Sequence, residues 1–295
     1  MTAAPRPRYR LRLGTHAHDL PDRTLVMGIV NCTPDSFYPG GRAPEPQRAV
    51  ERYHQVVAEG ADWVDVGGES TRPGAAAVPA AEEWARIAPV VEAARRAGHP
   101  IPLSVDTTKY DVAARALDAG AAIVNDVSAL AFEPRLADLA ARYGAGLILM
   151  HMRGTPATMQ QDPVYADVVG EIRARLAAAM ERAAERGVAA EQIVVDPGIG
   201  FGKTLAHNLE ILGRLEEFAL LRRPVLIGCS RKGFIGALLD LPADERLEGT
   251  LAAHVAAVCA GASIVRVHDV RAHVRALRVL DAVRAAQPSA AARDA

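Results

Sequence analysis

Short apolar segments recur eight times along the chain, and each is followed by a polar turn and then by an amphipathic stretch. Runs of this length, apolar almost throughout, are typical of parallel strands that are buried on both faces. The expected strands are residues 25–30, 63–66, 102–105, 122–124, 146–150, 192–195, 224–228 and 263–267. Helical periodicity predicts helices between them, including residues 43–59, 80–97, 109–119, 134–142, 168–186 and 208–215. Several of these helices end at a glycine, which is a common left-handed C-cap.

Eight strand–helix units with even spacing and no long linker predict one (β/α)8 barrel, a TIM barrel, over residues 25–285. An open doubly wound sheet is the weaker alternative because the spacing is so even. Residues 1–24 form an N-terminal extension, in which residues 9–13 and 20–23 are expected to make a short hairpin that plugs the barrel floor. Residues 286–295 are rich in Ala, Pro and Ser and are expected to form a disordered tail.

Charge and cysteine content exclude several classes of protein. The formal net charge is -1, so nothing favours binding to nucleic acid or to an acidic membrane surface, and an anionic ligand would need basic residues concentrated locally. Three widely spaced cysteines without a C-x-x-C pair disfavour a disulfide framework or a cysteine zinc site. No apolar run is long enough to span a bilayer, and the N-terminus lacks the apolar core of a secretory signal. A cytoplasmic protein is therefore expected.

Polar residues follow every one of the expected strands. In a barrel of this kind the active site is built from the carboxyl ends of the strands and from the loops after them. Those positions hold Asn31, residues 67–72, Asp106, Asn125 with Asp126, His151 with Met152, Asp196, residues 230–232, and Arg266 with His268. The opposite ends of the same strands carry mostly Gly, Ala, Pro and Gln. This asymmetry indicates an enzyme.

The polar residues at the strand ends divide into two chemical sets. Asp106, Asn125 and Asp196 are expected near the barrel axis, where a buried carboxylate or amide has to be paired. Together they suit a flat heterocycle with many N–H donors and ring acceptors. The second set suits an anion such as phosphate, with Mg²⁺ supplying further charge. Its members are Asn31, Lys232, Arg266 and His268.

Several of these residues also have a purely structural interpretation. Asp106 could cap the helix that follows it, and Asp196 could be an ordinary turn carboxylate. His151, after an apolar strand, is more often a satisfied core histidine than a catalyst. Residues 200–203 (G-F-G-K) resemble part of a phosphate loop but lack its full spacing, so a turn is the better interpretation. Arg231 could form a surface ion pair.

Ordered motifs cover nearly the whole chain, from Val26 to about Val283. They are M-G-I-V-N-C-T-P-D-S-F, V-D-V-G-G-E-S-T-R-P-G, S-V-D-T, I-V-N-D-V, L-M-H-M-R-G-T-P-A-T-M-Q, D-P-G-I-G-F-G-K, G-C-S-R-K-G-F-I-G and I-V-R-V-H-D-V. On these motifs the chain resembles the dihydropteroate synthase family, folate-pathway enzymes that sulfonamides inhibit. The resemblance implies a transferase that condenses 6-hydroxymethyl-7,8-dihydropterin pyrophosphate with p-aminobenzoate and releases 7,8-dihydropteroate and pyrophosphate.

The same resemblance implies a set of residues for each substrate. The residues implied to bind the pterin are Asp106, Asn125, Met152, Asp196, Phe201 and Lys232. Those implied to bind the pyrophosphate are Asn31, Arg266 and His268, with Mg²⁺ near Asn31. Those implied to form the p-aminobenzoate pocket are Phe37, Thr71, Arg72, Pro73 and Gly233, with loops 33–41 and 70–74 closing over the site. The expected catalytic residues are Asp35, Asp106 and Lys232, and a homodimer is the family expectation.

No Ser-His-Asp or Cys-His constellation occurs at the strand ends. Its absence favours an SN1-like path, in which pyrophosphate leaves first and the aromatic amine then attacks the pterin methylene cation. Ionised Asp106, with Asp35, would offset the positive charge. Two positions depart from the family pattern. Gly233 stands where Ser is common, so weaker p-aminobenzoate binding is expected, and Tyr38-Pro39 stands where an acidic or small polar residue is common.

Three other classes of protein compete with this interpretation. A methyltetrahydrofolate-dependent corrinoid methyltransferase would share the pterin carboxylates but has no use for the S-R-K-G and R-V-H-D segments. A pterin-binding but catalytically silent paralogue stays open from the sequence alone. A barrel that serves only as an assembly scaffold would not need polar residues at every strand end.

Overall fold

The computed structural model describes residues 8–14, 16–20, 23–33, 45–72 and 74–286. The strands of its larger sheet are β3 (Leu25–Asn31), β4 (Trp63–Gly67), β5 (Leu103–Asp106), β6 (Ile123–Asp126), β7 (Gly146–Met150), β8 (Ile193–Asp196), β9 (Leu226–Ile227) and β10 (Ile264–Val267). All neighbours are parallel, in the order β8-β7-β6-β5-β4-β3-β10-β9. The two ends of that order meet where Val195 pairs with Val225, and the Val195 N–H donates to the Pro224 carbonyl at 3.0 Å. The expected (β/α)8 barrel is confirmed.

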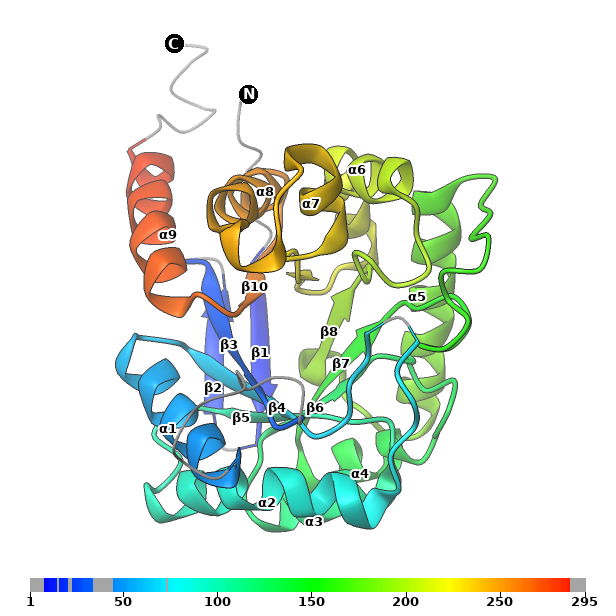
Figure 1. The fold of residues 1–295 in the computed structure, drawn as a ribbon. Helices are drawn as coiled ribbons and strands as arrows, with labels where there is room; N and C mark the ends of the chain where they lie inside the picture. Colours follow the sequence, from blue (N-terminus) through cyan, green and yellow to red (C-terminus); the bar gives the residue numbers. More distant parts are fainter. Residues whose placement is uncertain (1–7, 15, 21–22, 34–44, 73, 287–295) are drawn as a thin grey trace.

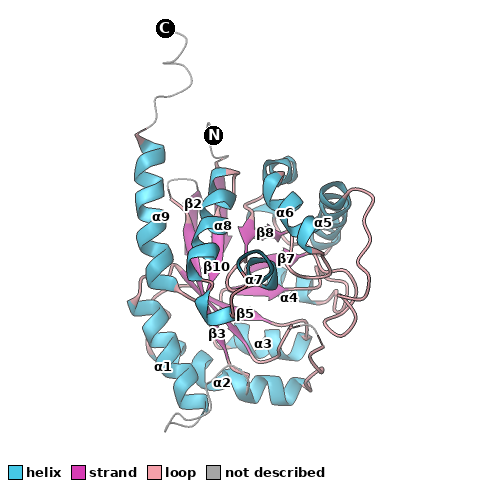
Figure 2. Cartoon of the chain, turned by 45° about the horizontal axis from the view of Figure 1, so that its top comes forward, coloured by secondary structure: helices cyan, strands magenta, loops and turns pink. Residues whose placement is uncertain are grey.

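Helices surround the strands (Figures 1 and 2). They are α1 (Glu45–Ala58), α2 (Ala80–Arg96), α3 (Tyr110–Asp118), α4 (Leu136–Tyr143), α5 (Val168–Glu185), α6 (Leu205–Gly213), α7 (Gly233–Leu239), α8 (Leu247–Cys259) and α9 (Val270–Ala285), with 3-10 turns η2 (Ala190–Gln192), η3 (Leu215–Leu221) and η4 (Ala243–Glu245). The predicted glycine caps are confirmed, because Gly60, Gly98, Gly120, Gly144 and Gly187 all have positive φ. Within the described ranges, no helix has the length and apolarity needed to cross a membrane.

An antiparallel hairpin precedes the barrel, as expected. Its strands are β1 (Tyr9–Leu13) and β2 (His16–Leu20), and Leu13 pairs with His16. The prediction that residues 20–23 form the second strand is wrong, because the tight turn at Gly14 starts the return strand earlier. Leu11 and Leu13 are fully buried and pack with apolar residues from the amino ends of the barrel strands, including Trp63, Met27 and Ile264. The hairpin therefore closes the barrel floor.

Gly146→Ala is expected to lower the free energy of unfolding by about 1–3 kcal/mol, the usual cost of overpacking a core. A Cβ at Gly146 would lie 2.3 Å from Leu13 Cδ2, so the hairpin would have to move. Gly213→Ala is the matched control, because no atom lies within 4 Å of its added Cβ. Urea unfolding of both variants measures the difference. Equal stability of the two variants would show that the hairpin does not pack tightly into the floor.

Candidate active site

A guanidinium joins carboxylates from two neighbouring strands at the carboxyl end of the barrel. Arg266 in β10 donates from Nε to Asp65 Oδ2 in β4 at 2.6 Å, and from Nη2 to Asp106 Oδ2 in β5 at 2.9 Å. Asn125 in β6 donates to the same Asp65 oxygen at 3.0 Å. Asp65 is fully buried, where an unpaired carboxylate is very unfavourable, so Arg266 supplies the charge that stabilises it. Four strands thus bring together one cation, two carboxyls and an amide.

Burial raises the pKa of Asp106 to about 8; the charge of Arg266 opposes this rise, and the charge of Asp65 adds to it. Positive charge that develops beside this carboxyl would favour its ionised form. The alternative that Asp106 caps the next helix is wrong. Helix α3 begins at Tyr110 with Lys109 as its N-cap, and the Lys109 N–H donates to Thr107 Oγ1 at 3.1 Å. Asp106 is therefore available for chemistry.

Lys232, the N-cap residue of α7, extends over the loop that follows β8. Its Nζ donates to the Ile199 carbonyl and lies 4.5 Å from the centre of the Phe201 ring. Asp196, at the end of β8, accepts the Gly198 N–H at 2.7 Å, which fixes the same loop. Burial lowers the pKa of Lys232 to about 8, and the charge of Asp196 opposes that shift. A cation, an aromatic face and a buried carboxyl thus surround one loop. Such a set can bind a flat polar heterocycle through stacking and hydrogen bonds.

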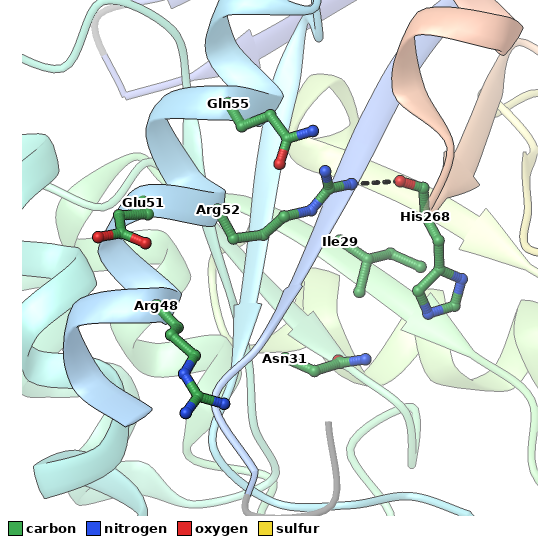
Figure 3. Close-up of a pocket in the computed structure, with 7 residues that line it drawn as sticks. All are labelled: Ile29, Asn31, Arg48, Glu51, Arg52, Gln55 and His268. Carbon is green, nitrogen blue, oxygen red and sulfur yellow. Dashed lines mark hydrogen bonds between the residues drawn. The ribbon is translucent and has the colours of Figure 1, made fainter. Parts of the chain in front are cut away.

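A cavity of about 310 Å³ opens beside Asn31 and His268 (Figure 3). Its lining residues are Ile29, Asn31, Arg48, Glu51, Arg52, Gln55 and His268. The His268 N–H donates to Ser230 Oγ at 3.1 Å, and the ring Nδ1 lies 3.0 Å from the same oxygen. Arg52 reaches from α1 and donates to the His268 carbonyl. Burial, with help from the charge of Arg266, lowers the pKa of His268 to about 3, so its imidazole is neutral.

The Ser230 contact is compatible with a proton on Nε2 of His268. If the Ser230 hydroxyl donates to Nδ1 while its oxygen accepts the backbone N–H, Nε2 carries the proton and is a donor. Arg48 and Arg52, from successive turns of α1, add two guanidinium groups to the cavity. This donor-rich, cationic lining suits a phosphate group.

Three residues of the site, Arg48, Arg52 and Asp65, are not among those predicted from the sequence. Arg48 and Arg52 lie on a helix face that only the fold turns towards the strand ends; their i, i+4 spacing is the one signal for them. Asp65 interrupts the apolar strand β4, and a carboxylate in such a strand has to be paired, which is a signal that the sequence does carry.

The neighbouring loops hold the other expected residues. Thr71 and Arg72 lie after β4, where the Gly74 N–H donates to the Pro156 carbonyl at 3.0 Å and so joins this loop to the one after β7. Gly233 is the first residue of α7, and no atom lies within 4 Å of a Cβ placed there. The expected residues Asp35, Phe37 and Pro73, and the Tyr38-Pro39 pair, lie outside the described residues.

Two structural interpretations are confirmed. His151 is buried at the end of β7, with Lys203 Nζ 3.1 Å from Nδ1 and Arg175 Nη1 3.3 Å from Nε2, so it is a satisfied core histidine. Arg231 forms an ion pair with Asp269 at 2.6 Å. Residues 200–203 form a turn that leads into α6, whose N-cap is Thr204, and Met152, after β7, is half-buried.

Comparison with known proteins gives one consistent result. The family model described as pterin binding enzyme matches residues 27–268. A dihydropteroate synthase of Synechocystis is 46% identical over 274 residues, covering 92% of this chain and 94% of the relative. The crystal structure of Xanthomonas albilineans dihydropteroate synthase with 4-aminobenzoic acid is similar at 43% identity and TM-score 0.87, covering 96% of this chain and 100% of that one. The Thermus thermophilus dihydropteroate synthase in complex with 6HMPPP is similar at 44% identity and TM-score 0.80, covering 93% and 99%.

Proposed function

Because the chain belongs to the pterin-binding enzyme family, in which its close relatives are dihydropteroate synthases, we propose that it condenses 6-hydroxymethyl-7,8-dihydropterin pyrophosphate with p-aminobenzoate. It is a transferase of folate biosynthesis. The observation that carries this proposal is the position of the buried Asp65–Arg266–Asp106 cluster, with Asn125, beside a cavity lined by cations at the same barrel end. Related enzymes were crystallised with 4-aminobenzoic acid and with 6HMPPP, which fits these two substrates.

The pterin ring lies among the carboxyls and Lys232 in this proposal. Asp106, Asp196 and Asn125 bond to the ring N–H groups and acceptors, while Phe201 and Met152 flank its faces. In this arrangement the polar groups at the strand ends find hydrogen-bond partners on the ring, as buried polar groups require.

The pyrophosphate occupies the cavity beside Asn31 and His268. His268 Nε2 donates one hydrogen bond, and two of the five N–H donors of Arg266 remain committed to Asp65 and Asp106, which leaves others for phosphate oxygens. Arg266 therefore links the charge on the pterin side with the charge on the leaving group. This assignment rests on the shared cavity and on the donor chemistry of its lining.

Mg²⁺ fits the donor set at this cavity only in partnership with substrate. No group of three or more His, Cys, Asp or Glu side chains suited to a metal occurs among the described residues. The amide oxygen of Asn31 and the carboxylate of Glu51 do line the cavity, and Mg²⁺ commonly takes one or two protein oxygens plus phosphates and water. Asn31 would hold the ion, which would supply positive charge to the departing pyrophosphate.

Loss of pyrophosphate before attack by the amine is expected, because the described site holds no constellation of a nucleophile and an adjacent general base. Substrate labelled with ¹⁸O at the bridging oxygen should therefore scramble its label when incubated with enzyme in the absence of p-aminobenzoate. Recovery of unscrambled substrate, with product formed only when amine is present, would contradict this path and favour direct displacement.

The p-aminobenzoate carboxylate lies at the start of α7, and its ring lies against the loop that holds Thr71 and Arg72. The open space at Gly233 leaves backbone N–H groups of the helix start accessible to the carboxylate. A Ser hydroxyl at this position would add one donor, so this chain is expected to bind the amine more weakly than a Ser-bearing relative.

A bell-shaped dependence of kcat/KM on pH is expected. Asp106 acts ionised, and its pKa of about 8 means that activity rises as pH increases through that value. Lys232 acts protonated, and its pKa of about 8 means that activity falls as pH increases through the same region. Lys232→Arg keeps its charge at higher pH, so its alkaline limb should move upwards while the acid limb stays. An unchanged alkaline limb in this variant would exclude Lys232 as the titrating group.

The competing functions make different predictions for this site. A methyltransferase needs no cationic cavity for a leaving group, and the cavity beside His268 therefore disfavours it. A silent paralogue would bind the pterin without turnover.

We also propose that the enzyme is cytoplasmic and that it forms a homodimer. The dimer proposal rests on α9, which leaves Val279 and Val283 exposed where a second copy could cover them. Light scattering that gives the mass of a monomer would overturn the dimer.

A further inference from the structure

A second cavity, of about 420 Å³, lies at the opposite end of the barrel from the active site. It is bordered by Arg8, Tyr9 and Arg10 of the N-terminal hairpin region, by Glu191 in η2, and by Arg222 and Arg223 after η3. Residues 222–224 immediately precede β9, and η2 immediately precedes β8, so both segments belong to the amino ends of the strands. The mechanism uses no residue of this cavity.

The lining of this floor cavity is strongly positive, although the whole chain has a formal net charge of -1. It carries four arginines and one carboxylate. None of the four arginines forms a salt bridge with another described residue, and Nε of Arg223 is buried without a hydrogen-bond partner. Burial lowers the pKa of Arg223, and the charges of Tyr9 and Glu191 offset only part of that shift. Arg8, Arg10 and Arg222 are exposed, and like charges that line one cavity repel one another unless an anion lies between them.

We propose that this floor cavity binds a small polyvalent anion that carries phosphate or carboxylate groups. Guanidinium groups from two separate segments match such oxygens in bidentate geometry, and Arg223 Nε gains the acceptor that it lacks. The volume falls in the range of small-molecule sites. The bound anion joins the hairpin to the segment before β9, and so stabilises the plug that closes the barrel.

Isothermal titration with inorganic pyrophosphate, and separately with citrate, tests this site. The wild-type enzyme should bind two pyrophosphates, one in each cavity. Arg8→Gln/Arg222→Gln, which changes exposed side chains only, should lose one of them and keep kcat and both KM values within about twofold, because it is remote from the reacting atoms. His268→Gln should lose the other. Arg12→Gln, an exposed arginine of β1 outside the cavity, is the matched control and should keep both.

If Arg8→Gln/Arg222→Gln binds one citrate fewer than the wild type but as many pyrophosphates, the floor cavity is a carboxylate site. If it binds one pyrophosphate fewer but as many citrates, the floor cavity is a phosphate site. Either result supports an anion site. If wild-type protein and Arg8→Gln/Arg222→Gln bound the same number of pyrophosphate ions and also the same number of citrate ions, the proposal would be overturned. Equal loss of affinity in Arg12→Gln would show only a general effect of surface charge, and would overturn it too.

Independently, Lys109 connects the loop after β4 to a fully buried carboxylate in α2. Its Nζ donates to Glu69 Oε2 at 2.8 Å and to Glu83 Oε2 at 2.6 Å. The other oxygen of Glu69 accepts the Val78 N–H at 2.6 Å, so both ends of segment 69–78 are tied together. Glu83 is fully buried, and a buried carboxylate needs a cation beside it, so Lys109 is held in place by its own partner.

We infer that Lys109 is a positioning residue for p-aminobenzoate, an inference that rests on the proposed function. Segment 69–78 carries Thr71 and Arg72, and no hydrogen bond or salt bridge joins the described residues of this segment to the Asp65–Arg266–Asp106 cluster. Fixing this segment in advance lowers the entropy that amine binding has to overcome. The hydrogen bonds of the cluster involve no residue of this segment, and Glu83 acts on Asp106 only through its charge, which adds to the rise in the pKa of Asp106.

Lys109→Met/Glu83→Gln tests this role, because the second change removes the buried charge that would otherwise destabilise the fold. KM for p-aminobenzoate should rise by about tenfold or more, while KM for the pterin substrate changes less than about twofold. Lys109→Arg keeps the cation and should recover most of the loss. Equal rises in both KM values, or no rise, would overturn the positioning role. Failure of the proposed function is distinguishable, because then the wild-type protein would show no turnover.

Discussion

Asp106→Asn is expected to lower kcat/KM by about 10²- to 10³-fold, the usual effect of removing one preorganised charge that faces developing charge. The substitution keeps the shape of the side chain but removes the only charge that it brings to the methylene cation. Arg266 retains its 2.6 Å bond to Asp65, so the core of the cluster is preserved. The variant should therefore fold normally and still bind the pterin.

Asp138→Asn is the matched control for this experiment. Asp138 lies in α4 and forms a salt bridge with Arg186 at 3.0 Å, but it is partly exposed and remote from the site. Both variants should unfold within about 1 kcal/mol of the wild type, as surface or isosteric changes do. Steady-state kinetics with both substrates gives the comparison. An Asp106→Asn enzyme as active as Asp138→Asn would exclude ionised Asp106 from the reaction.

Arg266→Met is expected to abolish measurable turnover and to destabilise the fold by about 3–5 kcal/mol, because it leaves the fully buried Asp65 without its cation. The double variant Arg266→Met/Asp65→Asn removes the orphaned charge as well. It should regain most of the stability, since the amide oxygen introduced in β4 can still accept the hydrogen bond from Asn125.

Activity and stability should separate in this pair of variants. The double variant recovers its unfolding midpoint in urea but stays inactive, because no guanidinium is left between pterin and pyrophosphate. If activity returned together with stability, Arg266 would have only a structural role. If the single variant were as stable as the wild type, the buried pair with Asp65 would contribute little to the fold.

The strands of the barrel follow from sequence because a parallel strand buried on both faces needs a continuous apolar run. The run at residues 146–150 coincides with β7, and most other limits agree within about two residues, the usual uncertainty of element ends. The hairpin register is harder to predict, since a turn at Gly14 decides it and the return strand lacks an apolar alternation. Local patterns are informative where burial is uniform, and less so where one turn sets the register.

The partners within the site do not follow from sequence. Arg266 bonds to carboxylates 201 and 160 residues away, and only the closed barrel brings β10, β4 and β5 to one place. Arg266 and His268 at the end of a strand indicate an anion site, so the sequence predicts a contact with phosphate. It does not predict the contacts of Arg266 with the two carboxylates. Asp65 is the clearest example, because its position inside an apolar strand shows that it needs a partner without showing which.

Both substrates are proposed to react at this one barrel end, and product formation tests that proposal. The purified protein is incubated with the dihydropterin pyrophosphate, p-aminobenzoate and Mg²⁺, and 7,8-dihydropteroate and pyrophosphate are followed together. We expect the two products to form in equal amounts, and dihydropteroate to require p-aminobenzoate. Tight binding of the pterin substrate with no dihydropteroate at any amine concentration would refute the proposed reaction.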